Sequence, residues 1–281
     1  MKRFDLRNKV VLITGASGGI GKAVAEQFYA CGANLILTDL SQETLDAAFA
    51  GMTRERVLLC AMDVTDMAAT KAVVANAVKR FERLDMAFAN AGIAAKVPKT
   101  MLSISESEFQ QIVNVDLFGV WNTIKASLPH VIASQGHILI TASIYAFING
   151  MVNAPYAASK AAIESLGRSL RIELAGTGAT AGVLYPGWVV TPIAEAAFGG
   201  HKEATELIKH TLSGPFGTAI QPEQLAKAIV AGVETRAPRI ITPKRWVPMS
   251  LLRGVLNAIS DAMLERDEKI RNLIRAIERQ A

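Results

Sequence analysis

The sequence predicts one α/β domain with a doubly wound, seven-stranded parallel sheet and helices on both faces, followed by a helical extension. Short apolar runs alternate with segments of helical length from residue 10 to residue 242. The runs are continuous rather than alternating in polarity, which is typical of parallel strands buried on both faces. A length of 281 residues allows one such domain plus an extension.

The expected elements follow one another in a βαβ rhythm, which favours a single domain over residues 1–243. The expected strands are Val10–Thr14, Asn34–Thr38, Val57–Ala61, Leu84–Ala89, His137–Thr141, Ala179–Tyr185 and Arg239–Thr242. The expected helices are Ile20–Cys31, Met67–Phe81, Glu106–Ile132, Tyr156–Leu174 and Pro222–Glu234.

Two segments depart from this rhythm. Residues 191–221 place glycines around a short helical stretch, His201–Leu212, and we interpret them as a mobile flap beside a substrate site. Residues 244–281 form a separate extension, in which apolar residues recur at helical spacing and predict two amphipathic helices. The apolar positions are Leu252, Val255, Leu256, Ile259 and Met263 in the first helix, and Ile270, Leu273, Ile274 and Ile277 in the second.

The apolar stripes of the extension need a partner. The favoured interpretation is that they pack onto the same subunit or a neighbouring one. Two alternatives stay open. The extension could line the access path of a bulky lipophilic substrate, or it could rest on a membrane surface with its arginines toward anionic lipid.

Composition excludes several classes of protein. Hydrophobic residues make up 51% and charged residues 20% of the chain, which excludes a disordered or collagen-like protein. Basic residues are spread along the chain although the net charge is +5, so we expect no nucleic-acid partner. There is no continuous spanning run, no signal segment and no CxxC pair, so we expect a cytoplasmic protein. Four histidines without ligand spacing predict no metal site.

A glycine-rich loop joins the first strand to the first helix and reads Gly15-Ala16-Ser17-Gly18-Gly19-Ile20-Gly21. Gly15 would make the tight turn, Gly19 would let the backbone approach a pyrophosphate, and Gly21 would let helix and strand pack closely. The helix N-terminus would bind the phosphates. An ordinary βα turn is the alternative, but the strand–loop–helix context favours a dinucleotide site.

Asp39, at the end of the second strand, would select the cofactor. A carboxylate about 20 residues after the glycine loop accepts hydrogen bonds from the adenosine ribose, and it repels a 2′-phosphate. Neither Gly18 nor Leu40 offers a cation for that phosphate, so NAD is favoured over NADP. The alternative role of Asp39 is to cap the next helix.

Polar residues also follow the third and fourth strands. Asp63 and Val64 suit the rim of an adenine site, whereas Asn90, Ala91 and Gly92 would close the site where the strand order reverses. Taken alone, each of these motifs fits an ordinary polar turn.

Tyr156 and Lys160 lie four residues apart at the start of a helix, so their side chains share one face. A phenol with a pKa near 10 is a poor base at neutral pH. A lysine ammonium, together with a cationic nicotinamide, would favour the phenolate and lower that pKa. Ser143, just after the fifth strand, could donate a hydrogen bond to a carbonyl or alkoxide oxygen.

Together these motifs resemble the short-chain dehydrogenase/reductase family, over residues 6 to 243. The matching residues, in the family's order, are Thr14–Gly21, Asp63, Asn90-Ala91-Gly92, Asn114, Ser143, Tyr156-Ala157-Ala158-Ser159-Lys160 and Pro186-Gly187-Trp188-Val189-Val190-Thr191. The resemblance implies a Rossmann-type sheet and makes residues 1–243 a dinucleotide-binding and catalytic domain.

The resemblance also implies catalytic roles. Tyr156 would be the general acid and base, Lys160 would hold the nicotinamide ribose, and Ser143 would orient the substrate oxygen. Asn114 would help to hold a water relay to Lys160.

Four further residues after the sixth strand acquire roles in the same way. Thr191 and the backbone of Val189 would anchor the nicotinamide carboxamide, beside Pro186 and Gly187.

The family usually pairs its two long helices between subunits, which implies a homodimer or homotetramer.

The expected walls of the substrate pocket carry almost no charge. They are Ala94, Ala95, Ile144, Tyr145, Phe147, Trp188 and flap residues Ile193–Phe198. We therefore expect Ser143, Tyr145 and Trp188 to bind an apolar alcohol or ketone, with NAD(H) exchanging the hydride. The alternatives are a 3-oxoacyl thioester reductase, which would more often use NADPH, and a non-catalytic NAD-binding interaction module.

Overall fold

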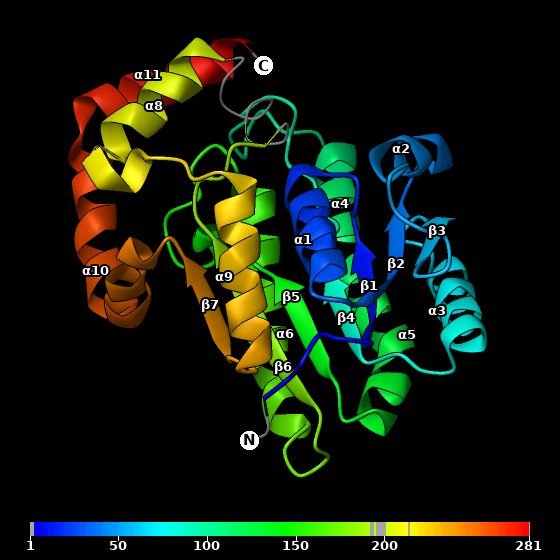
Figure 1. Cartoon of the computed structure of the whole chain (residues 1–281). Helices are drawn as coiled ribbons and strands as arrows, with labels where there is room; N and C mark the ends of the chain where they lie inside the picture. The colour runs from blue at the N-terminus through cyan, green and yellow to red at the C-terminus, as the bar shows by residue number, and fades with distance from the viewer. Residues whose placement is uncertain (1–2, 192–193, 195–200, 213, 281) are drawn as a thin grey trace.

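The computed structural model describes residues 3–191, 194, 201–212 and 214–280. Within them, seven parallel strands form one sheet in the order β3-β2-β1-β4-β5-β6-β7 (Figure 1). The strands are β1 (Val10–Thr14), β2 (Asn34–Asp39), β3 (Val57–Ala61), β4 (Met86–Ala89), β5 (His137–Thr141), β6 (Thr180–Pro186) and β7 (Arg239–Thr242). The predicted fold class is therefore confirmed, and the strand ends shift by no more than two residues.

Helices cover both faces of the sheet (Figure 1). They are α1 (Gly19–Ala30), α2 (Gln42–Ala48), α3 (Met67–Phe81), α4 (Glu106–Val113), α5 (Val120–Ala133), α6 (Ala154–Glu173), α8 (Lys202–Thr211), α9 (Pro222–Glu234), α10 (Val247–Arg266) and α11 (Glu268–Gln280). Val11 belongs to the core that contains α1 and α9, whereas Leu12 belongs to the core that contains α3, α5 and α6. Because neighbouring residues of β1 enter opposite cores, the whole strand is apolar.

The strand order reverses between β1 and β4, which pair directly although β2 and β3 separate them in the sequence. In a parallel sheet all carboxyl ends lie at one edge, and α/β proteins bind ligands in the crevice at such a reversal. The turns that follow β1, β4 and β5 therefore meet at one place.

The long helix expected over Glu106–Ile132 is interrupted. A π-helix, η1 (Asn114–Gly119), separates α4 from α5. A Cβ on Gly119 would lie 2.5 Å from Val64 Cγ2, so this glycine allows the helix to approach the turn after β3 closely. π-Helical turns of this kind often occur at functional sites.

The extension forms the two predicted helices, but their apolar stripes differ in burial. Residues of α11 pack against α8 in a small core of their own, which includes Ile270, Leu273, Ile277, Ala204 and Leu207. The stripe on α10 is instead between 54% and 68% exposed at Leu252, Val255, Ile259 and Met263. The same chain thus covers one stripe and leaves the other open. No helix among the described residues is long and apolar enough to cross a bilayer.

Candidate active site

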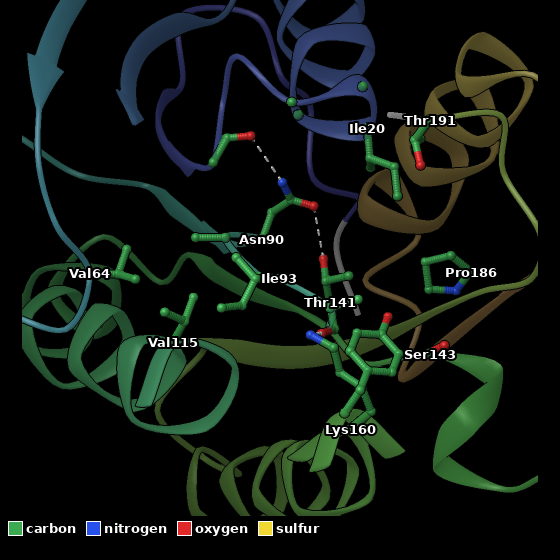
Figure 2. A pocket seen from close by; sticks show the side chains of 18 of the residues that line it. Ile20, Val64, Asn90, Ile93, Val115, Thr141, Ser143, Lys160, Pro186 and Thr191 are labelled. Carbon is green, nitrogen blue, oxygen red and sulfur yellow. Dashed lines mark hydrogen bonds between the residues drawn. The ribbon is translucent and has the colours of Figure 1, made fainter. Parts of the chain in front are cut away.

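A cavity of about 710 Å³ lies at the carboxyl edge of the sheet (Figure 2). Its volume is within the range of small-molecule and cofactor sites. The turns after β1 to β4 contribute Gly15, Ser17, Gly18, Gly19, Ile20, Gly21, Asp39, Asp63, Val64, Asn90, Ala91 and Gly92. Later segments contribute Asn114, Ser143, Tyr145, Tyr156, Lys160, Pro186, Gly187, Trp188, Val189 and Thr191. All the residues predicted to be catalytic or to bind the cofactor, together with Tyr145 and Trp188, are therefore brought together.

The glycine loop leaves space that side chains would fill. Gly15 has a φ of +63°, and a Cβ there would lie 2.8 Å from Ala91 Cα. A Cβ on Gly21 would lie 2.1 Å from the carbonyl oxygen of Gly15. Within the part of the chain that the structure describes, no side chain caps the N-terminus of α1, so its first N–H groups are available to an anion. This cradle fits the pyrophosphate of a dinucleotide.

Asp39 places a carboxylate on the rim of the cavity. Its Oδ2 accepts hydrogen bonds from the Ser17 N–H, at 3.0 Å, and from the Ser17 hydroxyl. Its Oδ1 accepts the Leu40 N–H at 2.9 Å. The cap of α2 is Ser41, whose side chain accepts the Thr44 N–H, so the alternative capping role for Asp39 is wrong. Asp39 joins the glycine loop to the end of β2 and brings negative charge to the cavity.

Asn90 bridges β1 and β5 beneath the cavity. Its backbone N–H donates to Thr14 Oγ1 at 3.0 Å, and its Nδ2 donates to the Thr14 carbonyl at 3.1 Å. Its Oδ1 accepts the Thr141 hydroxyl at 3.2 Å (Figure 2). Asp63 closes a turn on the rim instead, because its Oδ1 accepts both the N–H and the hydroxyl of Thr65 at 2.8 Å.

Ser143, Tyr156 and Lys160 meet where β5 ends. Ser143 is 6% exposed, and its hydroxyl lowers the pKa of Tyr156. Lys160, one turn further along α6, places its Nζ 5.2 Å from the centre of the Tyr156 ring. The same Nζ donates to the Thr141 carbonyl at 3.3 Å. Pro155 in the first turn favours this helix start, which puts both side chains toward the cavity.

A further charged group, Asp116, pairs with Lys160 at 3.0 Å and was not predicted. Burial lowers the pKa of Lys160, but the Asp116 carboxylate and Tyr156 together outweigh burial and raise it above its ordinary value. Burial raises the pKa of Tyr156. The Lys160 ammonium and the Ser143 hydroxyl lower it, whereas the Asp116 carboxylate raises it further. The predicted influence of the lysine on Tyr156 is therefore present, but the pKa of the phenol remains above its ordinary value.

Aromatic rings enclose the end of the cavity beside Tyr156. The Tyr145 ring lies edge-on to the Tyr156 ring, at 5.8 Å between centroids, and edge-on to the Trp188 ring at 6.1 Å. Ala94 and Ile144 also line this end. Since both rings and both aliphatic side chains are uncharged, this end suits an apolar substrate group.

Two predicted wall residues lie elsewhere. Ala95 and Phe147 are buried in the protein and do not line the cavity. Phe147 packs on Tyr185, at 5.9 Å between centroids, because the short helix after Ser143 turns it toward the core. Of the predicted flap residues, Ala194 lines the cavity, and the others lie outside the described residues.

The cavity also contains residues that the motifs did not indicate. They include Met62, Thr65, Ile93, Ser107, Gln110, Gln111, Val115, Thr141 and Asn153. Gln110 and Gln111 precede Asn114 by four and three residues, so helical spacing alone would have placed them on its face. Among the described residues, no group of His, Cys, Asp and Glu could hold a metal ion.

Comparisons with known proteins agree with this geometry. The family model for short chain dehydrogenases matches residues 9–201. Meso-2,3-butanediol dehydrogenase of Serratia marcescens is 31% identical over 224 residues, which cover 80% of this chain and 86% of that protein. A 3-oxoacyl-(acyl-carrier-protein) reductase of Thermotoga maritima is 33% identical over 228 residues, covering 80% and 90%. The crystal structure of a short chain dehydrogenase/reductase from Burkholderia phymatum in complex with NAD is 25% identical, with a TM-score of 0.77 over 94% of this chain and 97% of that one.

Proposed function

Because the chain belongs to the short-chain dehydrogenase family, we propose that it uses NAD(H) to interconvert a secondary alcohol and a ketone. The observation that carries this proposal is the cluster of Ser143, Tyr156 and Lys160 in the same cavity as the glycine loop. A module that only binds NAD would not need a half-buried tyrosine beside a buried lysine and a buried serine, so we disfavour a non-catalytic role.

The cluster can donate a proton to the substrate oxygen or accept a proton from it. In ketone reduction, Ser143 would donate a hydrogen bond to the carbonyl oxygen, and Tyr156 would transfer its phenolic proton to that oxygen. When bound, the nicotinamide supplies the hydride. The Lys160 ammonium would stabilise the phenolate that remains. Asn114 would hold a water that reconnects Lys160 with solvent. In alcohol oxidation, the phenolate would accept the hydroxyl proton.

The proposed cofactor contacts use the loops around this cluster. The glycine loop and the start of α1 would bind the pyrophosphate, and Asp63 and Val64 would border the adenine. Thr191 and Val189 would hold the carboxamide. The Asp39 carboxylate would accept hydrogen bonds from the adenosine ribose and repel a 2′-phosphate, which favours NAD(H).

The substitution Tyr156→Phe tests the chemistry, because it removes the proton carrier and keeps the ring. We expect kcat to fall about 10³-fold, with little change in the Kd for NADH. NADH absorbance would follow turnover over a panel of alcohols, ketones and 3-oxoacyl thioesters, and tryptophan fluorescence would report binding. Turnover within about tenfold of the wild type would contradict the assignment. A preference for thioesters with NADPH would support the reductase alternative.

Cofactor choice has its own test in Asp39→Ala. Loss of the carboxylate should narrow the preference for NADH over NADPH by about tenfold or more, because it removes both a ribose contact and a repulsion. Asp46→Ala is the matched control, since Asp46 lies nearby on α2 and pairs with Arg54. A wild-type enzyme that prefers NADPH would show that Asp39 does not select the cofactor.

We also propose assembly into a homodimer or homotetramer through the surfaces of α5 and α6. Phe118 and Trp121 are 53% and 44% exposed at the start of this surface, and Ile172 on α6 is 76% exposed. Exposed apolar side chains of this size favour an interface. Light scattering at micromolar concentration tests the proposal, and a monomer mass would contradict it.

A further inference from the structure

A buried carboxylate beside Lys160 has no role in the proposed proton transfer. Asp116 lies in η1, two residues after Asn114, and its side chain is 0% exposed. Asn114 lines the cavity, and Asp116 pairs with Lys160, which also lines it. The π-helical turn therefore contributes two side chains to the same site.

Asp116 joins three segments of the chain. Its Oδ1 accepts the N–H of Ile93, in the turn after β4, at 2.7 Å. Its Oδ2 lies 3.0 Å from Lys160 Nζ on α6. Each carboxylate oxygen thus has a distinct partner, and the lysine is held between Asp116 and the Thr141 carbonyl.

Gly92 leaves room for this pair. A Cβ on Gly92 would lie 3.2 Å from Lys160 Nζ and 3.4 Å from both oxygens of Asp116. These are tight contacts, so a side chain would press on the ion pair. The glycine that the sequence motif places at the cofactor site therefore also accommodates the charged pair.

The pair also explains how the lysine keeps its charge. The Lys160 side chain is 3% exposed, and an ammonium without a partner at that depth would tend to lose its proton. Among the described residues, the titratable groups that act on one another here are Asp116, Lys160, Tyr156 and Tyr145. The turn after β4 and the end of β5 contribute backbone groups to the pair.

We propose that Asp116 is a positioning residue that holds Lys160 in its charged form between η1 and α6, and thereby sets the pH range in which Tyr156 works. The consequence for turnover rests on the proposed function, whereas the consequence for the charge of Lys160 does not. The negative charge of Asp116 has two effects. It stabilises the lysine ammonium, and it opposes ionisation of Tyr156.

The substitution Asp116→Asn keeps an acceptor for the Ile93 N–H and removes the charge. The pKa of Lys160 should fall because its anionic partner is lost, and the pKa of Tyr156 should fall because a like charge is lost. Both limbs of the pH profile of alcohol oxidation should therefore move to lower pH, by about one unit. Asp116→Glu, which keeps the carboxylate, should retain the wild-type limbs even if kcat falls.

Cofactor binding provides a readout that needs no turnover. Because the lysine loses its proton at a lower pH in Asp116→Asn, the Kd for NADH should rise by about threefold between pH 7 and pH 10 in this variant, and much less in the wild type. Glu164→Gln is the matched control, because Glu164 is a buried carboxylate one turn further along α6 and pairs with Arg253. Its profile should match that of the wild type.

The pH profiles of turnover and of NADH binding decide the matter. If those of Asp116→Asn superimpose on the wild-type profiles after scaling, the proposal is wrong and Asp116 has a structural role only. If no alcohol or ketone is turned over, the proposed function fails while the binding profiles still test Asp116. If Asp116→Asn does not fold, the double variant Asp116→Asn/Lys160→Met decides. Since it removes both charges, it should fold with a Tm at or above that of Lys160→Met, which leaves the buried Asp116 carboxylate unpaired. A double variant that also fails to fold would overturn the proposal.

Discussion

Two ion pairs lie one turn apart on α6 and differ in depth. Lys160 pairs with Asp116 at 3.0 Å, and the two side chains are 3% and 0% exposed. Glu164 pairs with Arg253 at 2.6 Å, and Glu164 is 5% exposed whereas Arg253 is 31% exposed. The first pair is enclosed in the domain and acts on Tyr156. The second joins the domain to α10. One helix thus carries charge toward the cavity and also toward the extension.

Polar groups from the last two strands surround the second pair. Burial and the nearby Glu164 raise the pKa of Tyr185 to about 12, so this phenol stays neutral. Arg239 on β7 donates a hydrogen bond to Ser250 on α10. Trp246, at the start of the extension, is buried, and its Nε1 would lie 2.7 Å from a Cβ on Gly187. Polar contacts and one buried ring therefore attach α10, whereas apolar contacts attach α11.

The largest expected effect tests the apolar attachment. Leu273→Ala removes a side chain that is 9% exposed from the core between α8 and α11, and should lower the free energy of local opening by about 3 kcal/mol. Leu252→Ala on the exposed stripe of α10 is the control and should change it by less than about 0.5 kcal/mol. Hydrogen exchange in α8 and α11 measures both. Equal effects would mean that a partner covers α10 in solution.

A smaller effect is expected when the outer ion pair is broken. Arg253→Ala leaves the buried Glu164 carboxylate unpaired and should lower the free energy of unfolding by about 2 kcal/mol, less than for a fully enclosed pair. The double variant Glu164→Gln/Arg253→Met should recover most of this loss. Urea unfolding measures stability. The Kd for NADH should not change, and a large increase would show that the two pairs on α6 are coupled.

The smallest effect concerns a third pair, between His210 on α8 and Asp267 at the start of α11, with both side chains about one-third exposed at 2.8 Å. The hydrogen bond from His210 lowers the pKa of Asp267. Its contribution is therefore present above the ordinary aspartate pKa near 4 and is lost as the pH falls through the lowered value. Hydrogen exchange should show α8 and α11 loosening slightly on acidification. His210→Ala should reduce this pH dependence, and an unchanged dependence would exclude Asp267 as its source.

Much of the fold and of the site follows from local sequence patterns. β1, β3, β5 and β7 begin and end where the sequence predicts, because each coincides with a short, mainly apolar run between turns. The glycine loop and the Tyr156–Lys160 pair could also be predicted from the sequence. The positive φ of Gly15 and the shared helix face of Tyr156 and Lys160 each depend on a few consecutive residues.

The tertiary structure decided the features that depend on distant contacts. In the sequence, nothing distinguishes Asp116 from other polar residues of a helix. In the structure, it lies in η1 and pairs with Lys160, 44 residues later in the chain. The stripes of α10 and α11 have the same helical pattern, yet among the described residues only that of α11 meets an apolar partner, the face of α8. Periodicity shows that a face is apolar, but the charge of a buried lysine and the cover of a stripe are set by groups that only the folded chain brings near.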